Sequence, residues 1–315
     1  MKFKKFLLSI GMIFVALSFI YISAFSQVET FKKHVFTYKT IHNHLIKANI
    51  FLTDKPSKQP VVIYFHGGGF IFGNRDQGLP DNLRDHLLKN NYAVVSADYR
   101  LAPETKLAGI VEDVRDVVIW LKTNGEKQFS IDSKRMAVMG GSAAGYLALS
   151  TGLNVESPPQ AMVAISTPTD YSNSPPKGNE EILKQPGPYD IVKDKPVSYG
   201  DYSSRMQLWQ FLVKNQLALS EIFGFDVSRE KDRLKKFMLT EQITSDYPPI
   251  LLVHARNDHI VPLQQVEKFH AFLENKGVYS ELYLVENGHS TELIKNNPDA
   301  LQRIIKFLDK CLKEN

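Results

Sequence analysis

The sequence has almost no cysteine and little net charge of either sign. Its single cysteine, Cys311, excludes an intramolecular disulfide and any metal site built from several thiolates. The formal charge of +4 includes Lys2, Lys4 and Lys5, so the rest of the chain is close to neutral and shows no basic cluster of the kind that binds nucleic acid. With 43% hydrophobic and 23% charged residues, the composition also excludes a disordered chain and a polytopic membrane protein.

The N-terminal residues 1–26 have the organisation of a targeting segment. A basic start is followed by an apolar run at 6–22 and by small residues before Gln27. This pattern predicts an exported protein, either periplasmic or secreted. Because the run approaches the ~20 residues that cross a bilayer, an uncleaved membrane tether through residues 6–25 is the alternative. In both cases we expect residues 27–315 to form one domain.

Short apolar runs alternate with helical patterns along this domain. The runs that we interpret as strands are 34–38, 45–51, 61–65, 93–97, 135–139, 161–165, 250–254 and 280–285. The first two read as an antiparallel edge, and the others are short enough to be buried on both faces. Helices are predicted at 109–122, after Ser142, at 264–275 and around 304–312. This alternation predicts an α/β fold with a mostly parallel central sheet and helices on both of its faces.

One long insertion, at residues 171–247, breaks the alternation. Its first part, 171–200, is polar and contains five prolines, and a helix-like stretch follows at 206–223. A long insertion between two strands of a compact sheet is usually either functional or disordered. We predict a cap over the functional site, with a surface excursion as the alternative.

A glycine-rich turn carries the candidate nucleophile, Ser142. The sequence GGSAAG at 140–145 follows a predicted strand and opens a predicted helix, which is the context that exposes a nucleophilic serine. Such a tight turn demands tiny side chains two residues before and after the serine. Gly140 meets this demand, whereas Ala144 stands where a second glycine is usual. A phosphate cradle is the alternative, although neither a lysine nor a G-x-G-x-x-G spacing accompanies the turn.

A second glycine-rich segment supplies candidate donors for an oxyanion. His66 and Gly67 begin an HGGG sequence directly after a predicted strand. Successive glycines allow backbone N–H groups to approach a substrate oxygen closely. We therefore assign an oxyanion hole to the N–H groups of Gly68, Gly69 and Ala143. A glycine loop of purely structural use is the alternative.

The candidate acid and base follow two later strands. Asp258 lies in a turn after the strand at 250–254, and His289 follows the strand at 280–285. Both side chains therefore emerge at the carboxyl ends of parallel strands, where ligands bind in open α/β sheets. A histidine that is oriented by a carboxylate activates a serine hydroxyl, and Glu286 is the alternative carboxylate.

The remaining histidines have simpler explanations. His254 lies within a predicted strand, His259 would have to fold back on its neighbour Asp258, and His270 falls on a predicted helix. His42 and His44 could form a metal pair, but no cluster of carboxylates and histidines accompanies them, so we expect a solvated hairpin and no metal site.

Three motifs in a fixed order resemble those of the HGGG-type carboxylesterases, the hormone-sensitive-lipase-like and acetyl- or feruloyl-esterase-like branch of the α/β hydrolases. They are HGGG at 66–69, DYRLAPE at 98–104 and GSA at 141–143, and the resemblance spans residues 61–289. It implies an α/β-hydrolase catalytic domain with a cap, a Ser142, Asp258 and His289 triad in the usual chain order, and no metal or organic cofactor. Asp98 and Arg100 look like scaffold residues within that pattern.

The resemblance implies hydrolysis of short- to medium-chain esters of alcohols or sugars through an acyl-serine intermediate. Phe70 and Trp209 are candidate pocket residues, and Tyr202 and Trp209 would line an acyl pocket if the cap folds over the serine; both could instead pack the cap. The expected partner is thus a small-molecule or carbohydrate ester. An amide hydrolase with the same triad, either arylformamidase-like or a peptidase, is the alternative in chemistry. A catalytically inactive binding module is the alternative from another class.

Overall fold

The computed structural model describes residues 31–54, 58–153, 156–173, 177–179, 183 and 195–314. The predicted targeting segment at 1–26 lies outside these ranges, as does much of the proline-rich stretch at 171–200. Within the described ranges, no helix combines the length and the hydropathy that a membrane crossing requires.

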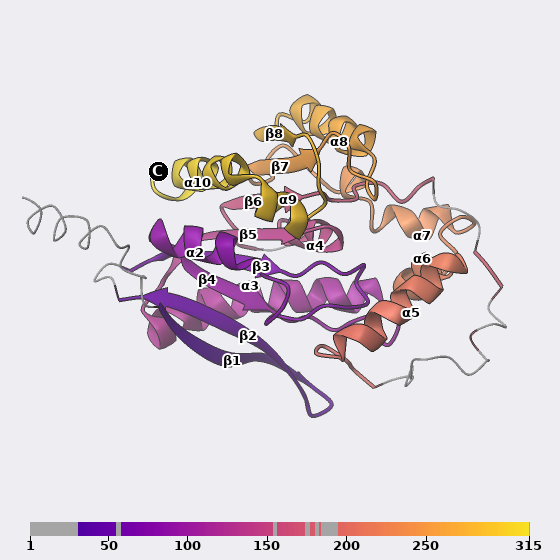
Figure 1. The fold of residues 1–315 in the computed structure, drawn as a ribbon, viewed down its shortest axis with the longest axis horizontal. Coiled ribbons are helices and arrows are strands. Elements are labelled where there is room, and N and C mark those ends of the chain that lie inside the picture. The colour runs from indigo at the N-terminus through magenta and orange to yellow at the C-terminus, as the bar shows by residue number, and fades with distance from the viewer. Residues whose placement is uncertain are drawn as a thin grey trace, which may run out of the picture. The chain divides into compact units, whose positions relative to one another are not determined.

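An eight-stranded sheet forms the centre of the fold (Figure 1). Its strand order is β1-β2-β4-β3-β5-β6-β7-β8, and the strands are β1 (Phe31–Ile41), β2 (His44–Thr53), β3 (Pro60–Phe65), β4 (Ala93–Ala97), β5 (Asp132–Gly141), β6 (Ala161–Ile165), β7 (Ile250–Ala255) and β8 (Ser280–Val285). The β1–β2 and β2–β4 pairs are antiparallel, and every other neighbouring pair is parallel. The predicted mostly parallel sheet with an antiparallel edge is therefore confirmed.

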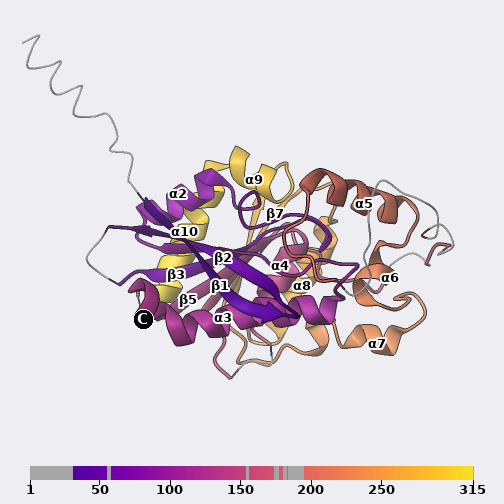
Figure 2. The ribbon, with the colours of Figure 1, turned by 90° about the horizontal axis from the view of Figure 1, so that it is seen from below.

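Helices cover both faces of this sheet (Figure 2). The body contains α2 (Asp81–Lys89), α3 (Leu107–Phe129), α4 (Ala143–Ser150), α8 (Leu263–Asn275), α9 (Thr291–Asn296) and α10 (Pro298–Leu312). Ile110 of α3 and Phe269 of α8 belong to one buried apolar cluster, while Leu83 of α2 and Ile304 of α10 belong to the other. Alternate side chains along each strand point to opposite faces, so the sheet separates two cores.

Two predicted helices differ from the structure in where they end. The helix predicted at 109–122 continues as α3 to Phe129, because a side chain at Gly125 would lie 2.7 Å from Ile131 and glycine permits this close packing inside the helix. The stretch predicted as one helix at 206–223 is two, and the break includes Gln216 with a φ of 57°. A positive φ cannot continue a right-handed helix.

The described part of the insertion gathers at one end of the strands (Figures 1 and 2). It contains α5 (Tyr202–Lys214), α6 (Ala218–Phe223), α7 (Lys231–Lys235) and the 3-10 helix η2 (Leu239–Glu241). Arg205 of α5 attaches it to the body: Nε donates to the carbonyl of Ile71 at 2.8 Å, Nη1 pairs with Glu104 at 2.7 Å, and Nη2 donates to the carbonyl of Ala102. The side chains of Arg205 and Glu104 are only 9% and 1% exposed.

The expected scaffold residues, Asp98 and Arg100, lie in the segment after β4 that also carries Ala102 and Glu104. Asp98 accepts hydrogen bonds from the backbone and the guanidinium of Arg75. Arg100 forms a two-pronged pair with Asp113 at 2.7 and 2.8 Å. Neither Asp98 nor Arg100 is among the described residues that line the pocket below, which agrees with a scaffold role.

Candidate active site

Ser142 lies on a tight turn between β5 and α4. Its φ of 56° and ψ of −130° are strained for a residue with a side chain. The N–H of Ser142 donates to the carbonyl of Ile165 at 2.8 Å, which ties the turn to the neighbouring strand β6. A Cβ atom at Gly140 would lie 2.2 Å from the carbonyl oxygen of Ala144, so the predicted need for glycine at 140 is confirmed.

The size limit after the serine applies at Gly145 and not at residue 144. A Cβ atom at Gly145 would lie 1.6 Å from the Thr167 hydroxyl oxygen, because α4 packs closely against the segment that follows β6. The Ala144 side chain is fully buried within the same turn. The departure from the G-x-S-x-G pattern at Ala144 is therefore accommodated by local packing.

Asp258 and His289 form a hydrogen-bonded pair. His289 Nδ1 lies 2.8 Å from Asp258 Oδ2, while Oδ1 accepts the N–H groups of Ile260 at 2.8 Å and Val261 at 3.0 Å. Burial opposes the ionisation of Asp258, but the hydrogen bonds from His289, Val261 and Ile260 prevail and lower its pKa to about 2. A charged carboxylate at neutral pH holds the proton on Nδ1, so Nε2 is left as the basic nitrogen.

The alternative residues lie elsewhere. Glu286 is exposed and accepts a hydrogen bond from Asn257, so the carboxylate beside His289 is that of Asp258. His259 is exposed, and His270 Nδ1 lies 2.8 Å from the hydroxyl of Ser280.

His254 was expected to be structural, and it packs beside the Asp258 turn. Its Nε2 lies 3.0 Å from the carbonyl oxygen of Val261 and 3.9 Å from Asp258 Oδ2. The side chain is fully buried, and burial lowers the pKa of His254, which favours the neutral ring. Its Nε2–H therefore donates to Val261 and fixes the turn that carries Asp258.

The hairpin histidines do not form a metal pair with carboxylates. His42 and Asn43 occupy the two-residue turn between β1 and β2 with positive φ values, a geometry typical of tight hairpins. His44 Nε2 lies 2.8 Å from the hydroxyl of Ser198. In the part of the chain that the structure describes, no group of three or more histidine, cysteine or acidic side chains could hold a metal ion.

The HGGG loop packs against the turn that carries Ser142. Gly68 and Gly69 have φ values of 112° and 58°, in the region that favours glycine. A Cβ atom at Gly67 would lie 3.0 Å from the carbonyl oxygen of Gly141 and 3.5 Å from Ser142 Cβ. The carbonyl of Gly68 accepts the N–H groups of two residues downstream and thereby closes the loop into a turn.

Three backbone N–H groups at this junction are unused. Those of Gly68, Gly69 and Ala143 donate no hydrogen bond to any residue that the structure describes, and all three residues line the same pocket as Ser142. Ala143 is the first residue of α4, where backbone N–H groups have no partner within the helix. The three donors are thus available to a bound oxygen atom.

His66 supports the loop at its first residue. Its Nδ1 lies 2.8 Å from the carbonyl oxygen of Gly67, and its ring stacks on Tyr99 with centroids 4.3 Å apart. Burial lowers the pKa of His66 to about 4, against the opposing hydrogen bond to Gly67. The imidazole is therefore neutral near pH 7, and its hydrogen bond fixes the first peptide of the loop.

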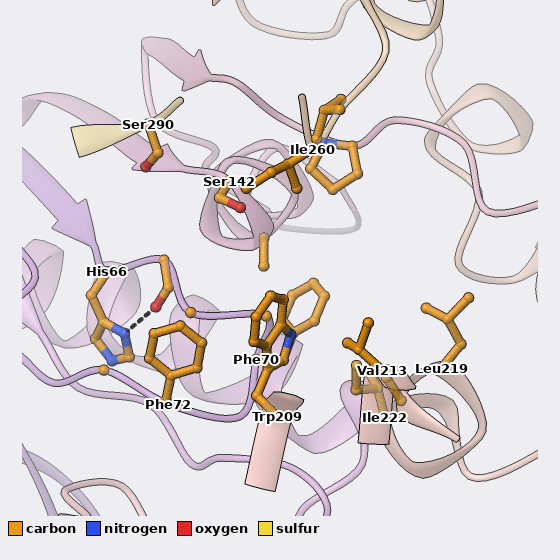
Figure 3. Close-up of a pocket in the computed structure, with 18 of the residues that line it drawn as sticks. His66, Phe70, Phe72, Ser142, Trp209, Val213, Leu219, Ile222, Ile260 and Ser290 are labelled. Atoms are coloured by element: carbon orange, nitrogen blue, oxygen red, sulfur yellow. Dashed lines mark hydrogen bonds between the residues drawn. The ribbon is translucent and has the colours of Figure 1, made fainter. Parts of the chain in front are cut away.

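One pocket of about 550 Å³ connects these groups (Figure 3). Ser142, His289 and the HGGG loop line one part of it, and α5 and α6 line another. Phe70, Trp209 and Tyr202 all line the pocket as expected, although Phe70 is only 2% exposed. Most of the apolar lining was not predicted, and it includes Phe72, Val213, Leu219, Ile222 and Ile260. The sequence signal for it was weak, because apolar residues on short cap helices could equally face inward.

Comparisons with known proteins agree with this architecture. The chain is 27% identical to part of the non-reducing polyketide synthase ausA of Aspergillus calidoustus, over 74% of the chain and 12% of the synthase. It thus spans only about an eighth of that curated relative. The probable carboxylesterase M8 of Phoma sp. is 24% identical over 78% of the chain and 84% of its own length. The thermophilic esterase Est2 of Thermogutta terrifontis has a TM-score of 0.64 at 20% identity, covering 88% of the chain and 91% of Est2.

The family comparison covers most of the domain. The BD-FAE model matches residues 49–273, a range that includes the HGGG loop, Ser142 and Asp258 and ends before His289. This match is longer than two thirds of the 315 residues. The chain therefore belongs to the BD-FAE family and has the α/β-hydrolase fold.

Proposed function

We propose that this protein is a serine carboxylesterase that hydrolyses short- to medium-chain carboxylic esters. The observation that carries the proposal is the convergence of Ser142, the Asp258–His289 pair and three unused N–H groups around one pocket. Acyl transfer needs this set of a nucleophile, an oriented base and oxyanion donors.

In the proposed mechanism, Ser142 Oγ attacks the ester carbonyl while His289 Nε2 takes its proton. Asp258 holds the imidazole and stabilises the imidazolium that forms. The N–H groups of Gly68, Gly69 and Ala143 stabilise the tetrahedral oxyanion. His289 then protonates the departing alcohol, and it later activates the water that releases the acid from the acyl-serine.

The resemblance to acetyl and feruloyl esterases makes acetyl and feruloyl esters of sugars the first natural substrates to try. Export, or a membrane tether through residues 6–25, would place the enzyme near such extracellular material. An amide hydrolase would use the same groups, and the apolar cap residues do not separate the two chemistries. An inactive binding module is the remaining alternative, although it would not need an oriented His289.

The test is hydrolysis of p-nitrophenyl esters of increasing acyl length by the purified full-length protein. Ser142→Ala should lose several orders of magnitude in kcat. The matched control is Ser150→Ala, because Ser150 lies on the same helix α4 and donates to the carbonyl of Leu147, away from the pocket. Turnover of acetate and butyrate that survives in Ser150→Ala but not in Ser142→Ala supports the esterase. Ester turnover that is independent of Ser142 contradicts it.

A further inference from the structure

The indole N–H of Trp209 is a hydrogen-bond donor within an apolar part of the pocket. Nε1 is the indole atom nearest to Gly69: a Cβ atom built at Gly69 would lie 2.4 Å from Nε1 and 2.7 Å from Cδ1. No hydrogen bond joins Nε1 to another described residue, and Nε1 is not among the enclosed polar atoms that lack a partner, so a ligand in the pocket can reach it. The ring is held at its other side by an edge-to-face contact with Phe72, with centroids 5.7 Å apart.

The unused indole N–H bears on substrate selection, because the pocket lining around it is apolar. Phe70 and Phe72 lie beside Trp209, and Val213, Leu219 and Ile222 lie next to them along the cap (Figure 3). Pockets of this kind are mostly apolar, and a few well-placed polar groups decide which ligands fit. A plain alkyl chain that covers the indole N–H would leave this donor without a hydrogen bond, which is unfavourable.

The position of the indole indicates which part of a substrate it would meet. Gly69 is one of the proposed oxyanion donors, so a substrate atom near Nε1 lies only a few bonds from the carbonyl carbon. The leaving alcohol must lie near His289, which protonates it. Along the sheet, β5, which precedes Ser142, lies between β3, which precedes the HGGG loop, and β8, which precedes His289. Trp209 packs against the HGGG loop at Gly69, so it lies on the side of Ser142 away from His289. The acyl chain is therefore the part that extends toward Trp209.

We propose that the Trp209 Nε1–H donates a hydrogen bond to the acyl group of the substrate and selects acyl chains that carry an ether or hydroxyl oxygen close to the carbonyl. This inference rests on the proposed esterase function and narrows its substrate class. A site that presents a hydrogen-bond donor disfavours the analogue that lacks the acceptor, because the bound analogue leaves the donor without a partner.

The test compares p-nitrophenyl methoxyacetate with p-nitrophenyl butyrate, which differ by an oxygen in place of one methylene two bonds from the carbonyl carbon. The kcat/KM ratio of the two esters is measured for the wild-type protein and for Trp209→Phe, which keeps an aromatic ring against Phe72 but lacks the N–H. The intrinsic reactivities of the esters cancel in this comparison. We expect the ratio to fall by about 3-fold to 10-fold in the variant, the effect of one neutral hydrogen bond.

The control variant is Phe72→Leu, which disturbs the aromatic contact but leaves the indole N–H in place. It should change both esters by the same factor. A ratio that is unchanged in Trp209→Phe, or that falls equally in Phe72→Leu, overturns the proposal and leaves the indole as a packing element.

A binding measurement separates this inference from the esterase proposal. In the Ser142→Ala background, calorimetry gives the dissociation constants of ethyl methoxyacetate and ethyl butyrate with and without Trp209→Phe. Loss of the preference for methoxyacetate on removal of the N–H supports the donor even if the wild-type protein hydrolyses neither ester. If the preference for ethyl methoxyacetate is the same with and without Trp209→Phe, the proposed donor is contradicted, whatever the turnover shows.

Discussion

The attachment of the cap should depend on the buried pair of Arg205 and Glu104. Arg205→Met removes the donors to Glu104, Ile71 and Ala102 and leaves a carboxylate that is 1% exposed without its partner. Removing one member of a buried ion pair typically costs about 3–5 kcal/mol. We therefore expect the free energy of unfolding of Arg205→Met to fall by about this amount in urea titrations.

Two further variants make this prediction specific. The double variant Arg205→Met with Glu104→Leu removes the stranded charge as well, so it should recover at least about 2 kcal/mol of the loss. Arg233→Met breaks an exposed pair with Glu230, whose side chains are 55% and 39% exposed, and should cost less than about 1 kcal/mol.

The assay should follow the cap and the body separately. In a Trp120→Phe background, Trp209 is the remaining tryptophan, so its fluorescence reports on the cap, and far-ultraviolet circular dichroism reports on the whole domain. If the cap detaches first, the fluorescence transition of Arg205→Met will precede the dichroism transition, and a single free energy no longer describes the variant. The role of the buried pair is refuted if Arg205→Met lowers the free energy of unfolding no more than Arg233→Met does, or if adding Glu104→Leu lowers it further.

Three other perturbations follow from the site. Gly68→Ala should lower kcat by about 10²-fold to 10³-fold in the p-nitrophenyl assay, because its Cβ would lie 2.0 Å from the Phe72 carbonyl oxygen and shift an oxyanion donor. The control is Gly277→Ala, which also has a positive φ, of 76°, but has no atom within 4 Å of its Cβ, and it should keep full activity. In wild-type protein, His66 has a folded-state pKa of about 4, below the unfolded value near 6.5, so the unfolded chain binds the proton first and stability falls as pH falls through this window. Between pH 7 and 5, His66→Gln should lose about 2 kcal/mol less than wild type in urea unfolding, and equal losses would contradict a buried neutral ring. His254→Leu removes the donor to Val261 and should lower kcat about 10-fold to 100-fold with little change in KM. The control is His270→Leu on α8, and an equal fall in kcat in that variant would contradict the role of His254 in fixing the Asp258 turn.

The body of the fold was largely predictable because its strands are short and apolar, and β3, β4, β6 and β7 are buried along their whole length. The runs at 61–65, 93–97, 161–165 and 280–285 match β3, β4, β6 and β8 closely. Helix ends were harder to predict, since they depend on tertiary contacts such as that of Gly125 with Ile131. The helix α2 was not singled out, because its pattern is short and lies between two loops.

The site was predictable where glycine and chain order carry the signal. Ser142, Asp258 and His289 lie on turns after strands, so a parallel sheet must bring them to the same edge. Two packing contacts were not predicted. Gly145 packs against Thr167, which belongs to another segment of the chain. His254 supports the Asp258 turn through the carbonyl of Val261, and the sequence does not show that the turn folds back onto the strand. The attachment of the cap through Arg205 was not predicted either, because nothing in the local sequence pairs Arg205 with Glu104.

The central claim is that Ser142 is a nucleophile activated by the His289 and Asp258 pair. The most direct test is reaction with an alkyl fluorophosphonate, in which the serine oxygen displaces fluoride, followed by intact-mass measurement and peptide mapping. The account predicts one adduct on Ser142, no adduct in Ser142→Ala, and labelling slowed by orders of magnitude in His289→Ala. An adduct on another residue, or labelling of Ser142 at the same rate without His289, would contradict it.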